Sequence, residues 1–121
     1  MILRKTFRFE ASHVLPKHPG KCSRLHGHSW VLHVSVSGPI DSETGFVMDY
    51  ADISERVRPI IDCLDHYHLN DIMPYPSSEH VVLYIAQRLD QYNFPWHMLA
   101  LEETCTSYCE LTRTEYLATR D

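Results

Sequence analysis

The stretch His26–Ser37, with the sequence HGHSWVLHVSVS, decides the fold because its side chains alternate in character. Alternation with a period of two is typical of a β-strand with two different faces. One face would carry histidines and apolar residues, namely His26, His28, Trp30, Leu32, Val34 and Val36. The opposite face would carry Ser29, His33, Ser35 and Ser37. The pattern therefore predicts a long strand over residues 26–37.

A second alternating segment precedes this one. Within Thr6–His13, one face would carry Phe7, Phe9, Ala11 and His13. The intervening segment, Pro16–Leu25, is rich in Lys, Pro and Gly and is predicted to be a loop. Gly38-Pro39 and Glu43-Thr44-Gly45 mark turns after the second strand.

Two helices are predicted in the middle of the chain. The first starts after Asp49, a suitable N-cap, and its apolar stripe is Ile53, Val57, Ile60, Ile61 and Leu64. Pro59 should kink this helix or end its first part. Ser77-Ser78 can cap the second helix, which Asn93-Phe94-Pro95 would end, and whose stripe is Val82, Ile85, Ala86 and Leu89.

Two more strands, over Met98–Thr104 and Tyr108–Thr114, complete the order ββααββ, which is an α+β fold. Two helices can cover one face of the sheet, and the other face and the edges would stay open unless the chain self-associates. The length predicts that residues 1–121 form a single domain.

Composition excludes several classes of protein. The net charge of −5 argues against a general nucleic-acid binder, which needs a basic field. No apolar run approaches the roughly 20 residues of a membrane span. The first residues lack the pattern of a signal peptide, so we expect a cytoplasmic protein with its four cysteines reduced.

Three histidines form a candidate metal site. His26 and His28 lie two residues apart on one strand face, and His13 would join them if the two strands pair antiparallel. Three neutral imidazoles with a fourth position open are typical of catalytic zinc, although other divalent metals also accept imidazole. The alternative is that the histidines of such a short motif are ordinary surface residues that bind no metal. No fourth protein ligand is evident from the sequence.

Cys22 is a candidate proton acceptor. It lies four residues before His26 and is flanked by Lys21 and Arg24, and these cations favour its thiolate form. The alternative is a buried structural cysteine, which its polar neighbours argue against.

Two further sites carry acidic side chains. Asp65-His66 can form an acid–base couple, or it can be a solvated acid beside a histidine at a helix end. Glu103 shares a strand face with Leu99 and Leu101, where a carboxylate needs a partner. The paired donors of an amino-pyrimidinone ring would suit it, and the alternative is an ordinary glutamate at a strand end.

Six motifs in this order resemble the 6-pyruvoyl-tetrahydropterin synthase family over nearly the whole chain. They are FRFEASH at 7–13, CSRLHGH at 22–28, GFVMDY at 45–50, LDH at 64–66 with LND at 69–71, PSSE at 76–79 and ETCT at 103–106. The C-terminal stretch, residues 115–121, runs past the part that this resemblance covers.

The resemblance implies roles for these residues. His13, His26 and His28 would bind Zn²⁺, Cys22 would accept a proton, and Asp65 and His66 would be its acid–base partners. Glu103 would hold the pterin ring and belong to the same relay, and Ser77, Ser78 and Glu79 would make further pterin contacts. The implied architecture is the tunnelling fold: a ββααββ subunit has a four-stranded antiparallel sheet with two helices on one face. Such subunits form trimers or dimers of trimers, with the active sites between subunits.

One spacing points to a branch of the family. Three residues separate Cys22 from His26, which resembles the carboxy-forming branch of 7-deazaguanine and queuosine biosynthesis. This implies conversion of 7,8-dihydroneopterin triphosphate to 6-carboxy-tetrahydropterin, with release of acetaldehyde and triphosphate. The alternatives are a pyruvoyl-forming synthase, which eliminates triphosphate without carbon–carbon cleavage, and a non-catalytic zinc-binding oligomer.

Overall fold

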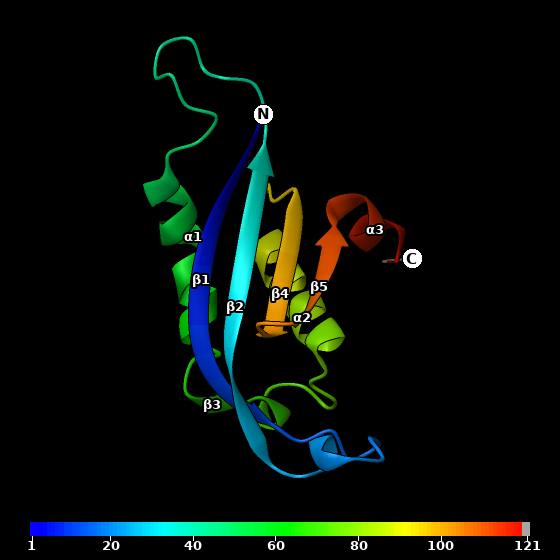
Figure 1. Cartoon of the computed structure of the whole chain (residues 1–121). Helices are drawn as coiled ribbons and strands as arrows, with labels where there is room; N and C mark the ends of the chain where they lie inside the picture. Colours follow the sequence, from blue (N-terminus) through cyan, green and yellow to red (C-terminus); the bar gives the residue numbers. More distant parts are fainter. Residues whose placement is uncertain (120–121) are drawn as a thin grey trace.

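The computed structural model of the chain describes residues 1–119. Two long strands, β1 (Ile2–His13) and β2 (His26–Ser37), pair antiparallel along their whole length (Figure 1). The prediction for β2 is confirmed at both ends. Strand β1 begins earlier than the predicted Thr6, because Leu3 continues the alternation and packs against the core.

The sheet has five strands in the order β3-β1-β2-β4-β5. Strands β4 (Met98–Thr104) and β5 (Ser107–Thr112) extend the antiparallel part on the β2 side. The fifth strand, β3 (Tyr67–His68), was not predicted and pairs parallel with β1 at Ala11 and Ser12. Two residues are too short for a period-two pattern to mark them, so the expectation of four antiparallel strands missed this one.

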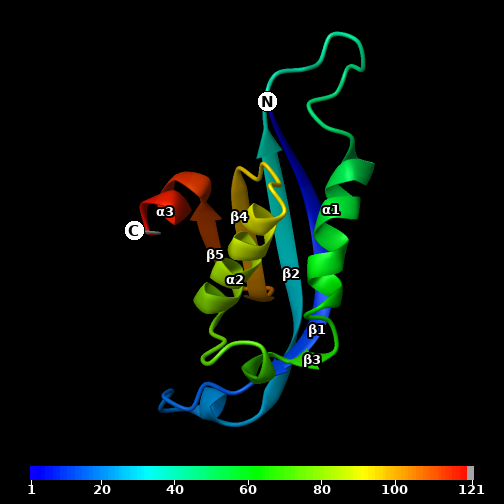
Figure 2. The same cartoon turned by 180° about the vertical axis from the view of Figure 1, so that it is seen from behind.

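Two helices, α1 (Tyr50–Asp62) and α2 (Ser78–Gln91), cover one face of the sheet (Figure 2). Asp49 and Ser77 cap them as predicted, by accepting backbone N–H groups of the first turn. Helix α1 does not end at Pro59 but continues through it. The missing N–H there leaves the carbonyl of the exposed Glu55 without its helical donor, and water can hydrate that carbonyl.

The hydrophobic core lies between this sheet face and the two helices. All predicted stripe residues of both helices are buried, as are Phe7, Phe9, Trp30 and Leu32 from the sheet. The opposite sheet face is mostly polar, and no helix within residues 1–119 covers it (Figures 1 and 2). Within residues 1–119, every helix is too short or too polar to cross a bilayer.

The chain ends differently from the prediction. Strand β5 stops at Thr112 and not at Thr114, because Thr112 caps a third helix, α3 (Arg113–Ala118). Thr112 and Glu115 form a capping box, and the buried Tyr116 packs its ring 5.5 Å from that of Trp96. The signal was present in the sequence, since Thr-x-x-Glu is the capping-box pattern. Residues 120–121 lie outside the described part of the chain.

Replacing Thr112 by Ala should lower the free energy of unfolding by about 1 kcal/mol, because the first turn of α3 loses its cap. Urea unfolding followed by circular dichroism measures this. Thr114→Ala is the matched control, since Thr114 is exposed on the same helix and its change should be neutral. Equal losses in the two variants would contradict the capping role.

Candidate metal and catalytic site

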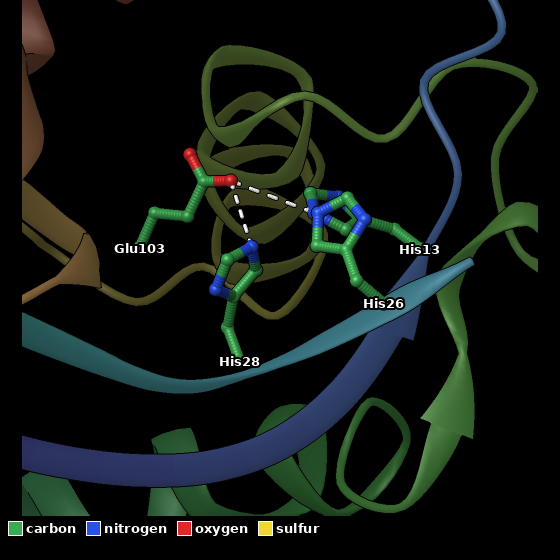
Figure 3. A group of neighbouring side chains, drawn as sticks. All are labelled: His13, His26, His28 and Glu103. Atoms are coloured by element: carbon green, nitrogen blue, oxygen red, sulfur yellow. Dashed lines mark ion pairs between the residues drawn. The ribbon is translucent and has the colours of Figure 1, made fainter. Parts of the chain in front are cut away.

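Three histidines from two paired strands meet at one end of the sheet. His13 is directly opposite His26 in the β1–β2 register, and His28 lies two residues further along the same face of β2. Their ring centroids are 4.4 to 5.0 Å apart. One nitrogen of each ring and one oxygen of Glu103 all lie within 4.8 Å of one another (Figure 3). The predicted convergence of the three imidazoles is therefore present.

Backbone carbonyls fix the tautomers of two of these histidines. The Nδ1 of His13 donates to the carbonyl of Pro76, and the Nδ1 of His26 donates to the carbonyl of Arg24, each over 2.7 Å. A carbonyl only accepts, so each Nδ1 carries the proton and each neutral ring presents an Nε2 lone pair. Sequence reasoning missed both orienting groups, because a backbone carbonyl leaves no mark in the residue pattern.

The three Nε2 atoms are buried, and none has a hydrogen-bond partner within the described residues. The Glu103 carboxylate lies 3.0 Å from the His28 Nε2 without satisfying hydrogen-bond geometry. Burial lowers the pKa of His13 and of His28, which keeps both rings neutral, and neutral imidazole is the form that binds metal. Converging lone pairs beside a carboxylate fit a divalent cation.

Glu103 is the fourth member of this cluster. It lies at the end of β4, where a register shift between Glu102 and Thr104 interrupts the pairing with β5. The carboxylate Oε1 is 3.5 Å from the Nε2 of His13 as well as 3.0 Å from that of His28. The sequence placed Glu103 correctly on the apolar face but did not predict that it meets the histidines.

Trp30 forms the apolar support of the cluster. Its ring is fully buried and meets those of His13 and His28 edge to face at 5.2 and 5.4 Å. Its indole N–H donates to the carbonyl of Ala11 over 3.3 Å. This packing against Trp30 supports the imidazoles of His13 and His28 and limits their motion.

Asn70 fixes the backbone beside His13. Its side-chain amide accepts from the N–H of Val14 over 2.8 Å and donates to the carbonyl of Val14 over 2.9 Å. Val14 directly follows His13, so this pair of bonds holds the end of β1 against the segment after β3. Asn70 belongs to the LND motif at 69–71, to which the sequence alone assigned no contact.

Replacing Asn70 by Ala should lower the free energy of unfolding by about 1–3 kcal/mol, because two backbone groups of Val14 lose their partner. Chemical denaturation measures the loss. Asn70→Asp keeps the acceptor for the Val14 N–H and loses the donor, so it should fall between wild type and Asn70→Ala. A loss below about 0.5 kcal/mol for Asn70→Ala, the size expected at an unimportant surface position, would contradict this role.

Cys22 lies in the loop between β1 and β2, in a short 3-10 turn formed by Lys21–Ser23. The residue is half-buried, and its carbonyl accepts from the N–H of Leu15 over 2.8 Å. That bond ties the two sides of the loop together. Among the interactions described for residues 1–119, none joins Cys22 to Asp65 or His66.

Asp65 and His66 contact each other at the edge of the sheet. The His66 Nδ1 lies 3.0 Å from an Asp65 carboxylate oxygen, which also accepts from the Glu10 N–H over 2.8 Å. This backbone hydrogen bond lowers the pKa of Asp65. His66 has a φ of 64°, a left-handed conformation that is costly for a residue with a side chain, and its N–H donates to the Glu10 carbonyl. The pair is thus anchored to β1 with its imidazole exposed.

Ser77, Ser78 and Glu79 form the start of α2. Ser77 caps the helix, and the Ser78 hydroxyl donates to the Glu79 carboxylate over 2.7 Å. This bond lowers the pKa of Glu79. The preceding residue, Pro76, supplies the carbonyl that orients His13, so the segment is connected to the histidine cluster.

Residues 2–114 match the family model described as 6-pyruvoyl tetrahydropterin synthase. The chain belongs to this family. The resemblance drawn from the six sequence motifs is thereby confirmed, and so is the α+β tunnelling fold.

Relatives in the 6-pyruvoyl tetrahydropterin synthase family carry more than one activity name. A protein from Synechocystis sp. named 6-carboxy-5,6,7,8-tetrahydropterin synthase is 42% identical over an alignment of 114 residues, and the match covers 88% of each chain. A Pyrococcus furiosus protein named dihydroneopterin monophosphate aldolase is 36% identical over 81 residues, covering 67% of this chain and 68% of its own. The solved structure of Caenorhabditis elegans 6-pyruvoyl tetrahydropterin synthase superimposes with a TM-score of 0.85 at 23% identity, covering 93% and 94% of the two chains.

Proposed function

We propose that this chain is a zinc-dependent lyase of the carboxy-forming branch. It converts 7,8-dihydroneopterin triphosphate to 6-carboxy-tetrahydropterin, releases acetaldehyde and triphosphate, and serves 7-deazaguanine and queuosine biosynthesis in the cytoplasm. The observation that carries the proposal is the convergence of three buried Nε2 atoms without hydrogen bonds. The 42% identity to a relative named 6-carboxy-5,6,7,8-tetrahydropterin synthase supports the choice of branch.

His13, His26 and His28 hold the zinc in this proposal. When bound, zinc acts as a Lewis acid toward the oxygens of the substrate side chain. The carbonyls of Pro76 and Arg24 keep the Nε2 atoms of His13 and His26 free for the metal. The buried ring of Trp30 packs against the rings of His13 and His28.

Cys22 accepts a proton from the substrate side chain, and the Asp65–His66 pair moves a second one. Within one chain the pair has no described interaction with Cys22. We therefore propose a homo-oligomer, a trimer or a dimer of trimers, in which the pair of one subunit faces the Cys22 of the next. Two open edges support self-association: β5 lies at one side of the sheet, and β3 covers only Ala11 and Ser12 of β1 at the other.

The pterin ring binds beside the zinc. Glu103 accepts the paired N–H donors of its amino-pyrimidinone edge, because a carboxylate can take two such bonds at once. Ser77, Ser78 and Glu79 contact the ring from the start of α2. The connection from this segment to His13, through the Pro76 carbonyl, supports their place near the metal.

A product assay tests the reaction. The zinc-loaded protein is incubated with 7,8-dihydroneopterin triphosphate, pterin products are identified by mass spectrometry, and acetaldehyde is measured with a coupled dehydrogenase. The expected result is 6-carboxy-tetrahydropterin with one equivalent of acetaldehyde. Pyruvoyl-tetrahydropterin without acetaldehyde would move the chain to the pyruvoyl-forming branch. Zinc binding without turnover would favour a non-catalytic zinc-binding oligomer or a different pterin substrate, such as a monophosphate.

A further inference from the structure

The carboxylate of Glu103 lies among the histidine nitrogens. Its Oε1 is 3.0 Å from the Nε2 of His28 and 3.5 Å from that of His13, and the side chain is 23% exposed. Two ligands of one tetrahedral zinc ion lie roughly 3.3 Å apart, because each is about 2.0–2.1 Å from the ion. The distances from Glu103 therefore match those between ligands of a shared ion.

A simple hydrogen bond does not explain the contact with His13. The Nδ1 of His13 carries its proton to the Pro76 carbonyl, so the neutral ring directs a lone pair from Nε2 toward a carboxylate oxygen. Two acceptors at 3.5 Å repel each other unless a cation lies between them. The Nε2 of the neighbouring His26 also carries a lone pair, because its Nδ1 proton is held by the Arg24 carbonyl.

The backbone directs Glu103 alone to this cluster. The adjacent Glu102 points to the opposite sheet face, where its carboxylate is 2.6 Å from the Nε2 of His33. Successive residues of a strand point to opposite faces, and this alternation separates the two carboxylates. Neighbouring glutamates thus differ only in the face they occupy, which makes Glu102 a matched control for Glu103.

We propose that Glu103 is an exchangeable fourth ligand of the metal, which closes the site before substrate arrives and leaves when a pterin ring binds. The inference rests on the proposed function, in which both oxygens of Glu103 accept from the pterin ring. A carboxylate that makes this bidentate contact would give up its place at the metal and leave that position open. Metal and pterin then weaken each other's binding, because coupling between two sites is reciprocal.

Zinc affinity tests the ligand role without any turnover. Dissociation constants for Zn²⁺ are measured by competition with a chromophoric chelator for wild type, Glu103→Gln and Glu102→Gln, and circular dichroism verifies folding. Glu103→Gln should bind zinc at least about tenfold more weakly. Glu102→Gln should match wild type. Equal affinity in all three proteins would overturn the proposal.

Unsubstituted pterin tests the exchange, because it has the ring but no side chain to react. Saturating pterin should weaken zinc binding by wild type and by Glu102→Gln toward the affinity of Glu103→Gln. It should also change the visible spectrum of the Co²⁺-loaded wild-type protein. Unchanged zinc affinity with pterin bound would overturn the exchange. If the product assay fails but pterin still weakens zinc binding, the proposed reaction is wrong and the exchange of Glu103 stands.

Discussion

His28→Ala should lose bound zinc and lower kcat/KM by about a thousandfold or more. The side chain supplies one of three converging Nε2 atoms, and the remaining pair with Glu103 makes a weaker site. Lewis-acid stabilisation is worth several kcal/mol, and each 1.36 kcal/mol changes the rate about tenfold. Zinc content by mass spectrometry and turnover of 7,8-dihydroneopterin triphosphate measure the two effects.

His33→Ala is the control for this variant. His33 lies on the same strand but on the opposite face, where it contacts Thr6 and Glu102. The substitution His33→Ala removes one histidine outside the cluster, so zinc content and turnover should stay near those of wild type. His28 is only partly buried, with 18% of its side chain exposed, so its loss should leave the fold intact. If His28→Ala keeps its zinc and its turnover, the histidine cluster has no role in the reaction.

Cys22→Ala should lower kcat by about 10²–10⁴-fold while zinc stays bound. General acid–base catalysis contributes this much, and Cys22 lies outside the group of residues that can hold the metal. Single-turnover kinetics with zinc content determined on the same sample separates loss of the base from loss of the metal.

Cys63→Ala controls for removal of a thiol. Cys63 is exposed just after the end of α1 and its thiol has no role in the proposed reaction, so its replacement should leave kcat unchanged. Equal activity of Cys22→Ala and wild type would mean that another group accepts the proton. Loss of zinc from Cys22→Ala would instead make Cys22 part of the metal site.

Local patterns predicted the parts of the fold that depend on local chemistry. The alternation over 26–37 marked β2 from its first to its last residue, and it placed His26 and His28 on the face that His13 joins. The caps Asp49 and Ser77 were readable because a short polar side chain must accept the free N–H groups of a first helical turn.

Contacts set by distant pairing could not be predicted in this way. Glu103 meets the histidines because β4 pairs with β2, and the residue pattern of β4 does not show which strand it pairs with. The Pro76 carbonyl reaches His13 across 63 positions of sequence. Strand β3 is defined by pairing with β1 and not by its own composition. Under the proposed function, Asp65 and His66 would act with a second subunit, which the sequence of one chain does not place.

All three histidines belong to a single hairpin, since β1 and β2 follow each other with only residues 14–25 between them. Closing such a short loop costs little chain entropy and is fast, so the hairpin can bring its three histidines together early in folding. The Pro76 carbonyl arrives only when the more distant α2 segment docks. Gathering of the three imidazoles and final orientation of His13 thus depend on contacts of different range, one within a hairpin and one with a distant helical segment.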